Sequence, residues 1–358
     1  MEAYIKAVDY YLPERTRTNG DIEKKFPDWT DEKIYEKIGI RCRHIAAENE
    51  TALDMAQKAA EKLFAADKTL RQKTDFILFC TQSPDYKLPP NACILQDRLA
   101  LATTAGALDF NLGCSGYEYG LALAKGLVVG GMAKNVLLIT AETYTKHIHP
   151  KDKSNMSIFG DGASATIVSA EGGFARLGEF VFGTDGSGFE ELIVKTGGAR
   201  NPKKTDKIAL DENGHIVSAD HLYMDGGNIF SFTLKQIPKM VKTLLEKLEL
   251  TMDGVDLFIF HQANAYMLEF LRKKLKIESE RFYLCMENVG NTVSSTIPIA
   301  LCNAMKDGTL KGKKNVMLAG FGVGLSWSGC VCVFDERGGY FSIVFFIPAP
   351  KYEEKEAA

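Results

Sequence analysis

The feature that most constrains the fold of this chain is a strand pattern that occurs twice. The run DFILFC at residues 75–80 is repeated almost letter for letter as DLFIFH at residues 256–261. The run NVLLI begins 60 residues after Asp75, at Asn135, and NVMLA begins 59 residues after Asp256, at Asn315. Short apolar runs of this kind are typical of buried parallel strands. Two pairs at the same spacing indicate a duplicated unit.

Each repeat encloses one more strand-like piece, at residues 107–112 and 282–286, flanked by helical stretches. Each half is therefore expected to be a β-α-β-α-β unit of an α/β protein, with right-handed crossovers. We expect an N-terminal half over residues 1–172, a C-terminal half over 173–336 and an extension over 337–358. Functional side chains of such folds gather where the strands end, so we expect the site in the crevice between the halves.

The remaining segments give coarser expectations. Residues 51–68 have the apolar spacing of a helix, with Thr51 able to cap it. Residues 230–248 predict an amphipathic helix that contains Pro238. The glycine-rich stretch 183–225 predicts loops and short strands rather than a separate domain.

Composition excludes several functions. The 358 residues include 43 basic and 46 acidic residues, a net charge of −3 that predicts no nucleic-acid partner and no polybasic membrane patch. The sequence contains no run of 18 apolar residues, so it predicts no membrane span. Its first residues do not resemble a signal peptide. The eight cysteines form no Cys-x-x-Cys pair. We therefore expect a reduced, cytoplasmic protein in which most cysteines are small core residues.

Cys114 is the first candidate for chemistry. It lies in NLGCSGYEYGLALA (residues 111–124), where a strand-like piece ends and an apolar helix begins. The free N–H groups and positive dipole end of a helix favour a thiolate over a thiol. Gly113 and Gly116 leave room for a substrate to approach the sulfur. The alternative is a buried structural cysteine, and this segment alone does not decide between the two.

Three further segments are weak separately. His261 ends the second repeated strand, and Asn291 lies in a turn before another helix; a satisfied structural histidine and a helix cap are the alternatives. The turn GFGVGLSWSG at residues 320–329 could place backbone N–H groups near a carbonyl oxygen, and it lacks the ending of a phosphate loop. A metal site at His147 and His149 is not expected, because a His-x-His in a loop is more often solvated.

In combination these segments are specific, and the chain resembles β-ketoacyl-acyl-carrier-protein synthase III, a starter condensing enzyme of the thiolase superfamily. The likeness extends to RTNGDI (17–22), GIRCRHI (39–45), FGDGA (159–163), HQAN (261–264) and GNT (290–292), and it covers the chain to about Phe334. It implies a thiolase-like, five-layered αβαβα fold made of two duplicated halves, and a homodimer.

The resemblance also implies a mechanism. Cys114 accepts an acyl group from acyl-CoA or an acyl-carrier protein, and a decarboxylative condensation with malonyl-acyl-carrier protein then gives a β-ketoacyl product. His261 and Asn291 donate hydrogen bonds to the malonyl thioester oxygen. The backbone N–H groups of Cys114 and Val323 form the oxyanion hole. Coenzyme A and phosphopantetheine thioesters are substrates, and no metal or redox cofactor is implied.

Substrate-binding positions carry over less directly. Phe230 and Asn264 match positions that line the pantetheine channel, with a core aromatic and a capping amide as alternatives. Lys33 and Lys37 occupy the positions of a tryptophan and an arginine that stack on the adenine of coenzyme A. Lysine cannot replace a planar pair, although it can meet phosphates, and an ordinary solvated helix face is the alternative.

Two more positions depart from the pattern. Tyr266 replaces an arginine that contacts the coenzyme A phosphate and the carrier protein, so a donor bound to a carrier protein stays open. Leu88 matches a bulky residue that the partner subunit contributes to limit acyl length. Because leucine is smaller than phenylalanine, we expect a pocket that accepts more than acetyl.

Other functions remain open at this stage. Within the superfamily these are a specialised acyltransferase and a non-decarboxylative condensing enzyme. Outside these activities they are a catalytically silent partner subunit and a cysteine hydrolase. The acyl donor, the pathway and the role of residues 337–358 are not predicted.

Overall fold

The computed structural model describes residues 1–210 and 216–334, so the predicted extension over 337–358 lies outside the described residues. Its centre is a nine-stranded mixed sheet. In order across the sheet the strands are β13 (Leu257–Phe260), β14 (Asn315–Gly322), β15 (Ser326–Phe334), β8 (Ala175–Thr184), β1 (Tyr4–Tyr11), β7 (Gly162–Ser169), β6 (Asn135–Glu142), β4 (Phe76–Cys80) and β5 (Gly106–Phe110).

The two ends of this sheet have the same pattern. β4 is parallel to β6, β6 is antiparallel to β7, and β7 is antiparallel to β1. In the other half β13 is parallel to β14, β14 is antiparallel to β15, and β15 is antiparallel to β8. The halves join through β1 and β8, which pair at only two positions. The repeated runs form β4 with β6 and β13 with β14, which confirms the predicted duplication.

One predicted strand is wrong. Residues 107–112 form most of β5, but residues 282–286 form no strand and make only an isolated bridge from Phe282 to Phe258. The side chain of Gln262 explains the difference. Its Oε1 accepts from the N–H of Cys285 at 2.8 Å, and its Nε2 donates to the carbonyl of Tyr283 at 3.2 Å. A side chain thus satisfies backbone groups that a neighbouring strand satisfies in the first half.

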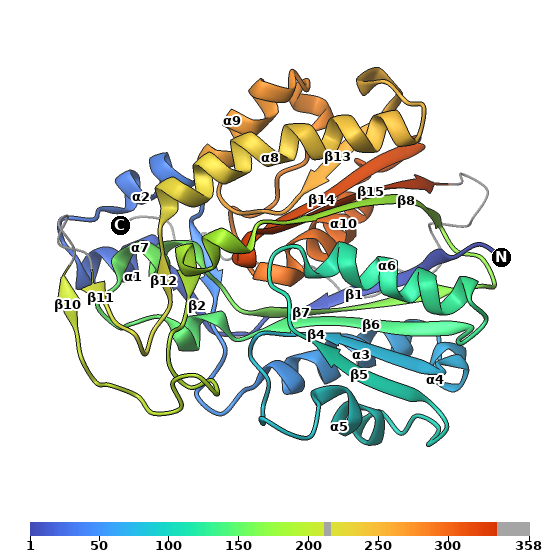
Figure 1. Ribbon diagram of the computed structural model, residues 1–358, viewed down its shortest axis with the longest axis horizontal. Coiled ribbons are helices and arrows are strands. Elements are labelled where there is room, and N and C mark those ends of the chain that lie inside the picture. Colours follow the sequence, from blue (N-terminus) through green and yellow to red (C-terminus); the bar gives the residue numbers. More distant parts are fainter. Residues whose placement is uncertain (211–215, 335–358) are drawn as a thin grey trace, which may run out of the picture.

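Helices cover and separate the two halves of the sheet (Figure 1). α3 packs on β1, β6 and β7, while α6 contacts both β6 and β14 and α8 packs on β8 and β15. The layers therefore alternate in the expected αβαβα order, with α6 and α10 in the middle. The helices are α1 (Asn19–Lys25), α2 (Asp31–Ile38), α3 (Ala52–Ala66), α4 (Thr69–Lys73), α5 (Asn91–Arg98), α6 (Gly116–Val129), α7 (Lys153–Ile158), α8 (Gly226–Lys247), α9 (Ala265–Leu275) and α10 (Thr296–Lys306).

Local sequence sets the ends of the predicted helices. Thr51 and Asp54 form a reciprocal capping box at the start of α3, as expected from the sequence. α8 begins four residues earlier than predicted, at Gly226, because the side chain of Asp225 accepts a hydrogen bond from Asn228 N–H and caps the helix there. Pro238 lies inside α8 without ending it.

The segment 183–225 contains short elements, as predicted. β9 (Leu192–Ile193) pairs with β12 (Tyr223–Met224), and β10 (Ala209–Leu210) pairs with β11 (Ile216–Val217). A further small sheet joins β2 (Thr16–Thr18) to β3 (Cys42–His44). All eight cysteines are free, and five of them are buried, in agreement with the expectation of small core residues. No helix in the described part of the chain has the length and apolar composition that crossing a membrane requires.

Candidate active site

Cys114, His261 and Asn291 line one cavity of about 100 Å³. Cys114 follows β5 and precedes α6, His261 follows β13 directly, and Asn291 lies in the turn before α10. These elements bring together side chains that are 147 and 30 residues apart in sequence (114 to 261 and 261 to 291). The structure therefore brings the three side chains together near the ends of the strands, as expected from the sequence.

Glycines allow the backbone to pass close to the sulfur of Cys114, which is only 6% exposed. A Cβ atom on Gly322 would lie 2.8 Å from the Sγ atom. A Cβ atom on Gly113 would lie 2.6 Å from the side chain of Val323 and 2.7 Å from that of Gln82. Any larger residue at these two positions has to displace the Cys114 side chain or its surroundings.

The charge state of Cys114 differs from the sequence-based expectation. Burial raises the pKa of its thiol to about 12, and the nearby Glu142 carboxyl adds to this effect. The backbone N–H groups of Val323 and of Cys114 itself donate toward the sulfur and act in the opposite direction. The resting group is a thiol, because the loss of hydration outweighs the helix N-terminus. A proton acceptor is therefore needed to generate the thiolate.

His261 is a neutral imidazole that lines the cavity. Its ring is 2% exposed and meets the ring of Phe321 edge-on, at 5.7 Å between centroids. Burial alone lowers its pKa to about 3, so the imidazole carries no charge at neutral pH. The Nδ1 atom lies 2.7 Å from Oγ1 of Thr296, and the Nε2 atom lies 3.5 Å from Nδ2 of Asn291.

The main chain holds Asn291 on both sides. Its N–H donates to the carbonyl of Ile158 at 3.0 Å, and its carbonyl accepts from Gly160 N–H at 3.0 Å. Its side-chain Oδ1 accepts from the N–H of Val293 at 2.9 Å. This bond fixes the amide orientation, because an N–H group can only donate. The Nδ2 group therefore faces His261 and the carbonyl of Ala263.

A buried acid lies beside Cys114 that the sequence reading missed. Glu142, the last residue of β6, accepts from the N–H of Gln82 and from Oγ of Ser83, each at 2.9 Å. Burial raises its pKa to about 8, so the group is a neutral acid at pH 7. A carboxylate at the end of a fully buried strand that carries no other ionisable residue is the sequence signal that could have identified it.

The predicted substrate-binding residues have different surroundings. Asn264 caps α9, with Oδ1 accepting from Met267 N–H at 2.8 Å, and it also lines the cavity. The side chain of Phe230 packs against those of Tyr266 and Phe270, with ring centroids 5.9 and 5.6 Å apart, and Phe230 is not among the residues that line the cavity. Asn264 therefore fits both alternatives, a residue of the pantetheine channel and a capping amide. The contacts of Phe230 are those of an aromatic cluster.

The remaining predicted positions lie away from the cavity of this chain. Leu88 is 81% exposed in the loop before α5. Lys33 and Lys37 lie on α2, and the Nζ atom of Lys37 lies 4.7 Å from the centre of the Trp29 ring. An aromatic ring is therefore present beside these lysines, although the positions predicted to stack on adenine carry none.

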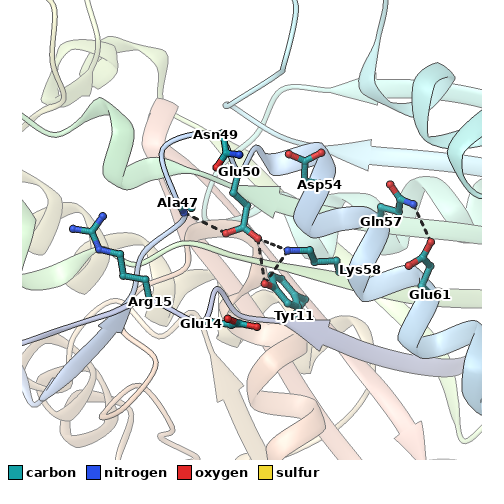
Figure 2. Close-up of a pocket in the computed structure, with 10 residues that line it drawn as sticks. All are labelled: Tyr11, Glu14, Arg15, Ala47, Asn49, Glu50, Asp54, Gln57, Lys58 and Glu61. Atoms are coloured by element: carbon teal, nitrogen blue, oxygen red, sulfur yellow. Dashed lines mark hydrogen bonds and ion pairs between the residues drawn. The ribbon is translucent and has the colours of Figure 1, made fainter.

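A second, larger depression is ordinary polar surface. It has a volume of about 640 Å³ and lies between the end of β1, the loop around Glu50 and α3. Figure 2 shows Glu50, Lys58 and Tyr11 bonded to one another, and Gln57 bonded to Glu61. Glu50 accepts from Lys58 at 2.6 Å and from the Tyr11 hydroxyl at 3.1 Å. Three of the polar side chains at its centre, Glu50, Lys58 and Tyr11, therefore have partners within the protein.

Within residues 1–210 and 216–334, no group of three or more His, Cys, Asp or Glu side chains is arranged to hold a metal ion. His147 contacts Oγ of Ser83 through Nε2 at 3.2 Å, and His149 accepts from Lys151 N–H through Nδ1 at 3.1 Å. These contacts account for the histidines of the His-x-His pair.

The alternating layers and the Cys–His–Asn cavity define a thiolase-like condensing enzyme, and known proteins specify the family. Models described as 3-oxoacyl-[acyl-carrier-protein] synthase III and as its C-terminal part match residues 108–186 and 245–334. The β-ketoacyl-[acyl-carrier-protein] synthase III of Caldanaerobacter subterraneus subsp. tengcongensis is 36% identical over 332 residues, 92% of this chain and 97% of that protein. That of Clostridioides difficile is 36% identical and covers 92% and 98% of the two chains.

Solved structures agree. A 3-oxoacyl-(acyl-carrier-protein) synthase III is 50% identical with a TM-score of 0.91, covering 93% of this chain and 100% of its own. A 3-oxoacyl-(acyl-carrier protein) synthase from Burkholderia xenovorans is 35% identical with a TM-score of 0.86, covering 93% and 94%. This chain belongs to the β-ketoacyl-acyl-carrier-protein synthase III family of acyltransferases.

Proposed function

We propose that this protein transfers an acyl group from acyl-CoA to Cys114 and then condenses it with malonyl-acyl-carrier protein. Carbon dioxide leaves in the second stage, and the product is a β-ketoacyl-acyl-carrier protein. The observation that carries this proposal is the shared cavity: a buried thiol, a neutral histidine and an oriented amide face one small space. The coenzyme A and malonyl thioesters are substrates.

In the first stage the thiol of Cys114 transfers its proton to Nε2 of His261, and the sulfur attacks the donor carbonyl. The C–S bond to coenzyme A breaks, and the departing thiolate takes up a proton from water. Splitting the reaction into two easier steps is the gain from a covalent intermediate. The N–H groups of Cys114 and Val323, which donate toward the resting sulfur, are the donors assigned to the oxyanion.

In the second stage the malonyl carboxylate leaves as carbon dioxide, and the electrons of the broken C–C bond form an enolate. Its oxygen accepts from the Nε2–H that His261 gained and from Nδ2 of Asn291. The enolate carbon attacks the acyl carbonyl, the bond to Cys114 breaks, and the sulfur recovers its proton from Nε2. The negative charge that decarboxylation leaves on the enolate is the counter-charge of the buried imidazolium in this stage. The full cycle consumes one proton from water.

We also propose that the active form is a homodimer. β5 is an unpaired edge of the main sheet, and its Leu108 is 40% exposed. Leu123 and Phe182, each 46% exposed, add apolar surface that a second copy can cover. Leu88, which is exposed in its own chain, is then available to close the acyl pocket of the partner. In this assignment the half 1–172 supplies the nucleophile, and the half 173–336 supplies His261 and Asn291.

The donor is the least constrained part of the reaction. Lys33 and Lys37 can meet phosphates but cannot form a stacking pair, and Tyr266 replaces a phosphate-binding arginine. The Trp29 ring, which lies beside the ammonium group of Lys37, supports a coenzyme A donor. It offers an aromatic face next to a cation that can meet phosphates. We therefore test acyl-CoA and acyl-carrier-protein donors in parallel.

The decisive assay supplies each donor of a chain-length series with malonyl-acyl-carrier protein labelled in the free carboxylate. Release of labelled carbon dioxide is measured together with the mass of the carrier-protein product. We expect both signals for at least one donor, their loss in Cys114→Ala, and their retention in Cys93→Ser, a control at the exposed cysteine. Acyl transfer without carbon dioxide release would identify a specialised acyltransferase instead. Silence with every donor would indicate a non-catalytic subunit.

A further inference from the structure

A closed ring of hydrogen bonds connects the active-site amide and histidine to the backbone of a single residue, Val293. The ring leaves the N–H of Val293, passes through Asn291, His261 and Thr296, and returns to the carbonyl of Val293. We propose that Val293 and Thr296 are positioning residues that hold His261 in the tautomer with its proton on Nδ1. This inference rests on the proposed function, because it assigns the state in which His261 receives the Cys114 proton.

The first half of the ring determines what Nε2 faces. The N–H of Val293 lies 2.9 Å from Oδ1 of Asn291 and can only donate, so Oδ1 is the acceptor there. The Nδ2 group, which is a donor in both of its hydrogens, therefore lies 3.5 Å from Nε2 of His261. A nitrogen that faces a donor must present a lone pair.

The second half gives the same answer independently. Oγ1 of Thr296 lies 3.1 Å from the carbonyl of Val293, which can only accept, so the single hydroxyl hydrogen points to that oxygen. Oγ1 is then an acceptor toward Nδ1 of His261 at 2.7 Å, and Nδ1 carries the proton. The two halves agree on one tautomer: N–H at Nδ1 and a lone pair at Nε2.

Val293 has the backbone conformation that such a double role needs. Its φ angle is +58°, in the left-handed region that β-branched residues rarely occupy. The residue is fully buried, with Thr292, Ser294 and Thr296 buried around it. Strained backbone of this kind persists where the surroundings over-determine it, and it is concentrated at functional sites. Here it turns the N–H of one residue toward the amide and its carbonyl toward the hydroxyl.

Among the residues that the structure describes, no charged group contributes to the pKa shift of His261. The ring of His261 meets the Phe321 edge, and burial is the sole cause of its lowered pKa. Hydrogen bonds alone therefore select the tautomer. The chemistry follows: Nε2 accepts the proton of Cys114 in the first stage and returns it in the last, while Nδ1–H stays bonded to Thr296 throughout. One proton moves between one sulfur and one nitrogen, and no other acceptor is required.

The test separates tautomer control from general structural support. Thr296→Val keeps the shape of the side chain and removes its hydrogen bonds, whereas Thr296→Ser keeps the hydroxyl. In the valine variant the Nδ1 proton has no partner, so only the contact of Nε2 with Asn291 still favours the Nδ1 tautomer, and a larger share of the neutral rings carries the proton on Nε2. Leaving a buried donor unpaired corresponds to a change of about 10- to 100-fold.

Three readouts are compared between the purified wild type and the Thr296 variants, each in the oligomeric state in which it is purified. These are acyl loading of Cys114 by rapid quench and intact mass, decarboxylation of malonyl-acyl-carrier protein without an acyl donor, and nitrogen chemical shifts of labelled histidine. The His261 signal is assigned by its loss in His261→Asn. We expect loading to fall about 10- to 100-fold in Thr296→Val, with rescue in Thr296→Ser to within about threefold of the wild type. Decarboxylation should equal or exceed that of the wild type, because a larger share of the rings already carries Nε2–H.

Several outcomes would overturn the inference. A wild-type spectrum with the His261 proton on Nε2 refutes it directly, whether or not the valine variant folds. Equal falls in loading and decarboxylation would indicate a merely structural role for Thr296. Normal loading in Thr296→Val would show that the hydroxyl is dispensable. If the wild type does not load Cys114 with any donor, the proposed function fails instead, and the histidine spectrum still tests the tautomer.

Discussion

Replacing Glu142 by glutamine should remove a pH-dependent cost from the folded state. The carboxyl group is buried beside Cys114 and accepts hydrogen bonds from Gln82 N–H and from Ser83 Oγ. Glutamine has the same shape and keeps one acceptor oxygen, and its NH₂ group can donate to the Ser83 hydroxyl. The change in hydrogen bonding has no pH dependence in this range, so any difference that varies with pH comes from the carboxyl proton.

The size of the effect follows from the pKa. Burial raises the pKa of Glu142 from 4.5 to about 8, so the folded state holds a proton that the unfolded chain releases. A raised pKa contributes stability that is fully present below pH 4.5 and is lost as the pH rises to about 8. At about 1.4 kcal/mol per pH unit, the wild type should lose about 3–4 kcal/mol relative to Glu142→Gln between pH 5 and pH 8.

Urea unfolding at pH 5, 6, 7 and 8 measures this difference. The free energy of unfolding is compared between the wild type and Glu142→Gln, with Glu36→Gln on the exposed face of α2 as the control. We expect the advantage of Glu142→Gln to grow steadily with pH and the control to follow the wild type. A constant offset between Glu142→Gln and the wild type would refute the reasoning, because it would mean that the carboxyl is not a buried neutral acid.

Three other substitutions test the site. His261→Gln should flatten the acid side of the stability curve: the pKa of His261 is lowered to about 3, so the wild type loses stability as the pH falls below 6.5, by about 2 kcal/mol at pH 5. An unchanged slope in urea titrations at pH 5–7 would contradict this. Gly322→Ala should reduce acyl loading about 100-fold in a folded protein, because its Cβ would lie 2.8 Å from the Cys114 sulfur; near-normal loading in stopped mass assays argues otherwise. Leu88→Phe should leave stability unchanged at an 81% exposed site and restrict activity to short donors. The proposal of a wide acyl pocket fails if the wild type already accepts only acetyl and propionyl donors.

Much of the fold was predictable because it depends on local apolar pattern. The runs at 75–80 and 256–261 have to be buried, and their spacing to Asn135 and Asn315 places them in equivalent positions of two halves. Strand ends then bring Cys114, His261 and Asn291 to one cavity. The segment 282–286 has a similar pattern, but the side chain of Gln262 bonds to its backbone, and no local rule anticipates a distant amide that replaces a strand.

The electrostatic state of the site was not predictable in the same way. A helix N-terminus after Cys114 suggests a thiolate, whereas the structure has a thiol, because burial of the sulfur raises its pKa more than the N–H groups of Val323 and Cys114 lower it. The left-handed backbone of Val293 and the contact between Thr296 and His261 exist only in the tertiary structure. The sequence predicts which residue types meet in the cavity, and packing determines where their protons lie.

The covalent acyl-enzyme is the central claim, and intact-protein mass spectrometry tests it most directly. The wild type and Cys114→Ala are incubated side by side with a panel of acyl-CoAs and acyl-carrier proteins. We predict a mass increase equal to one acyl group in the wild type, its absence in Cys114→Ala, and its discharge when malonyl-acyl-carrier protein is added. A wild-type mass that no donor changes, or an adduct that persists in Cys114→Ala, would contradict the account.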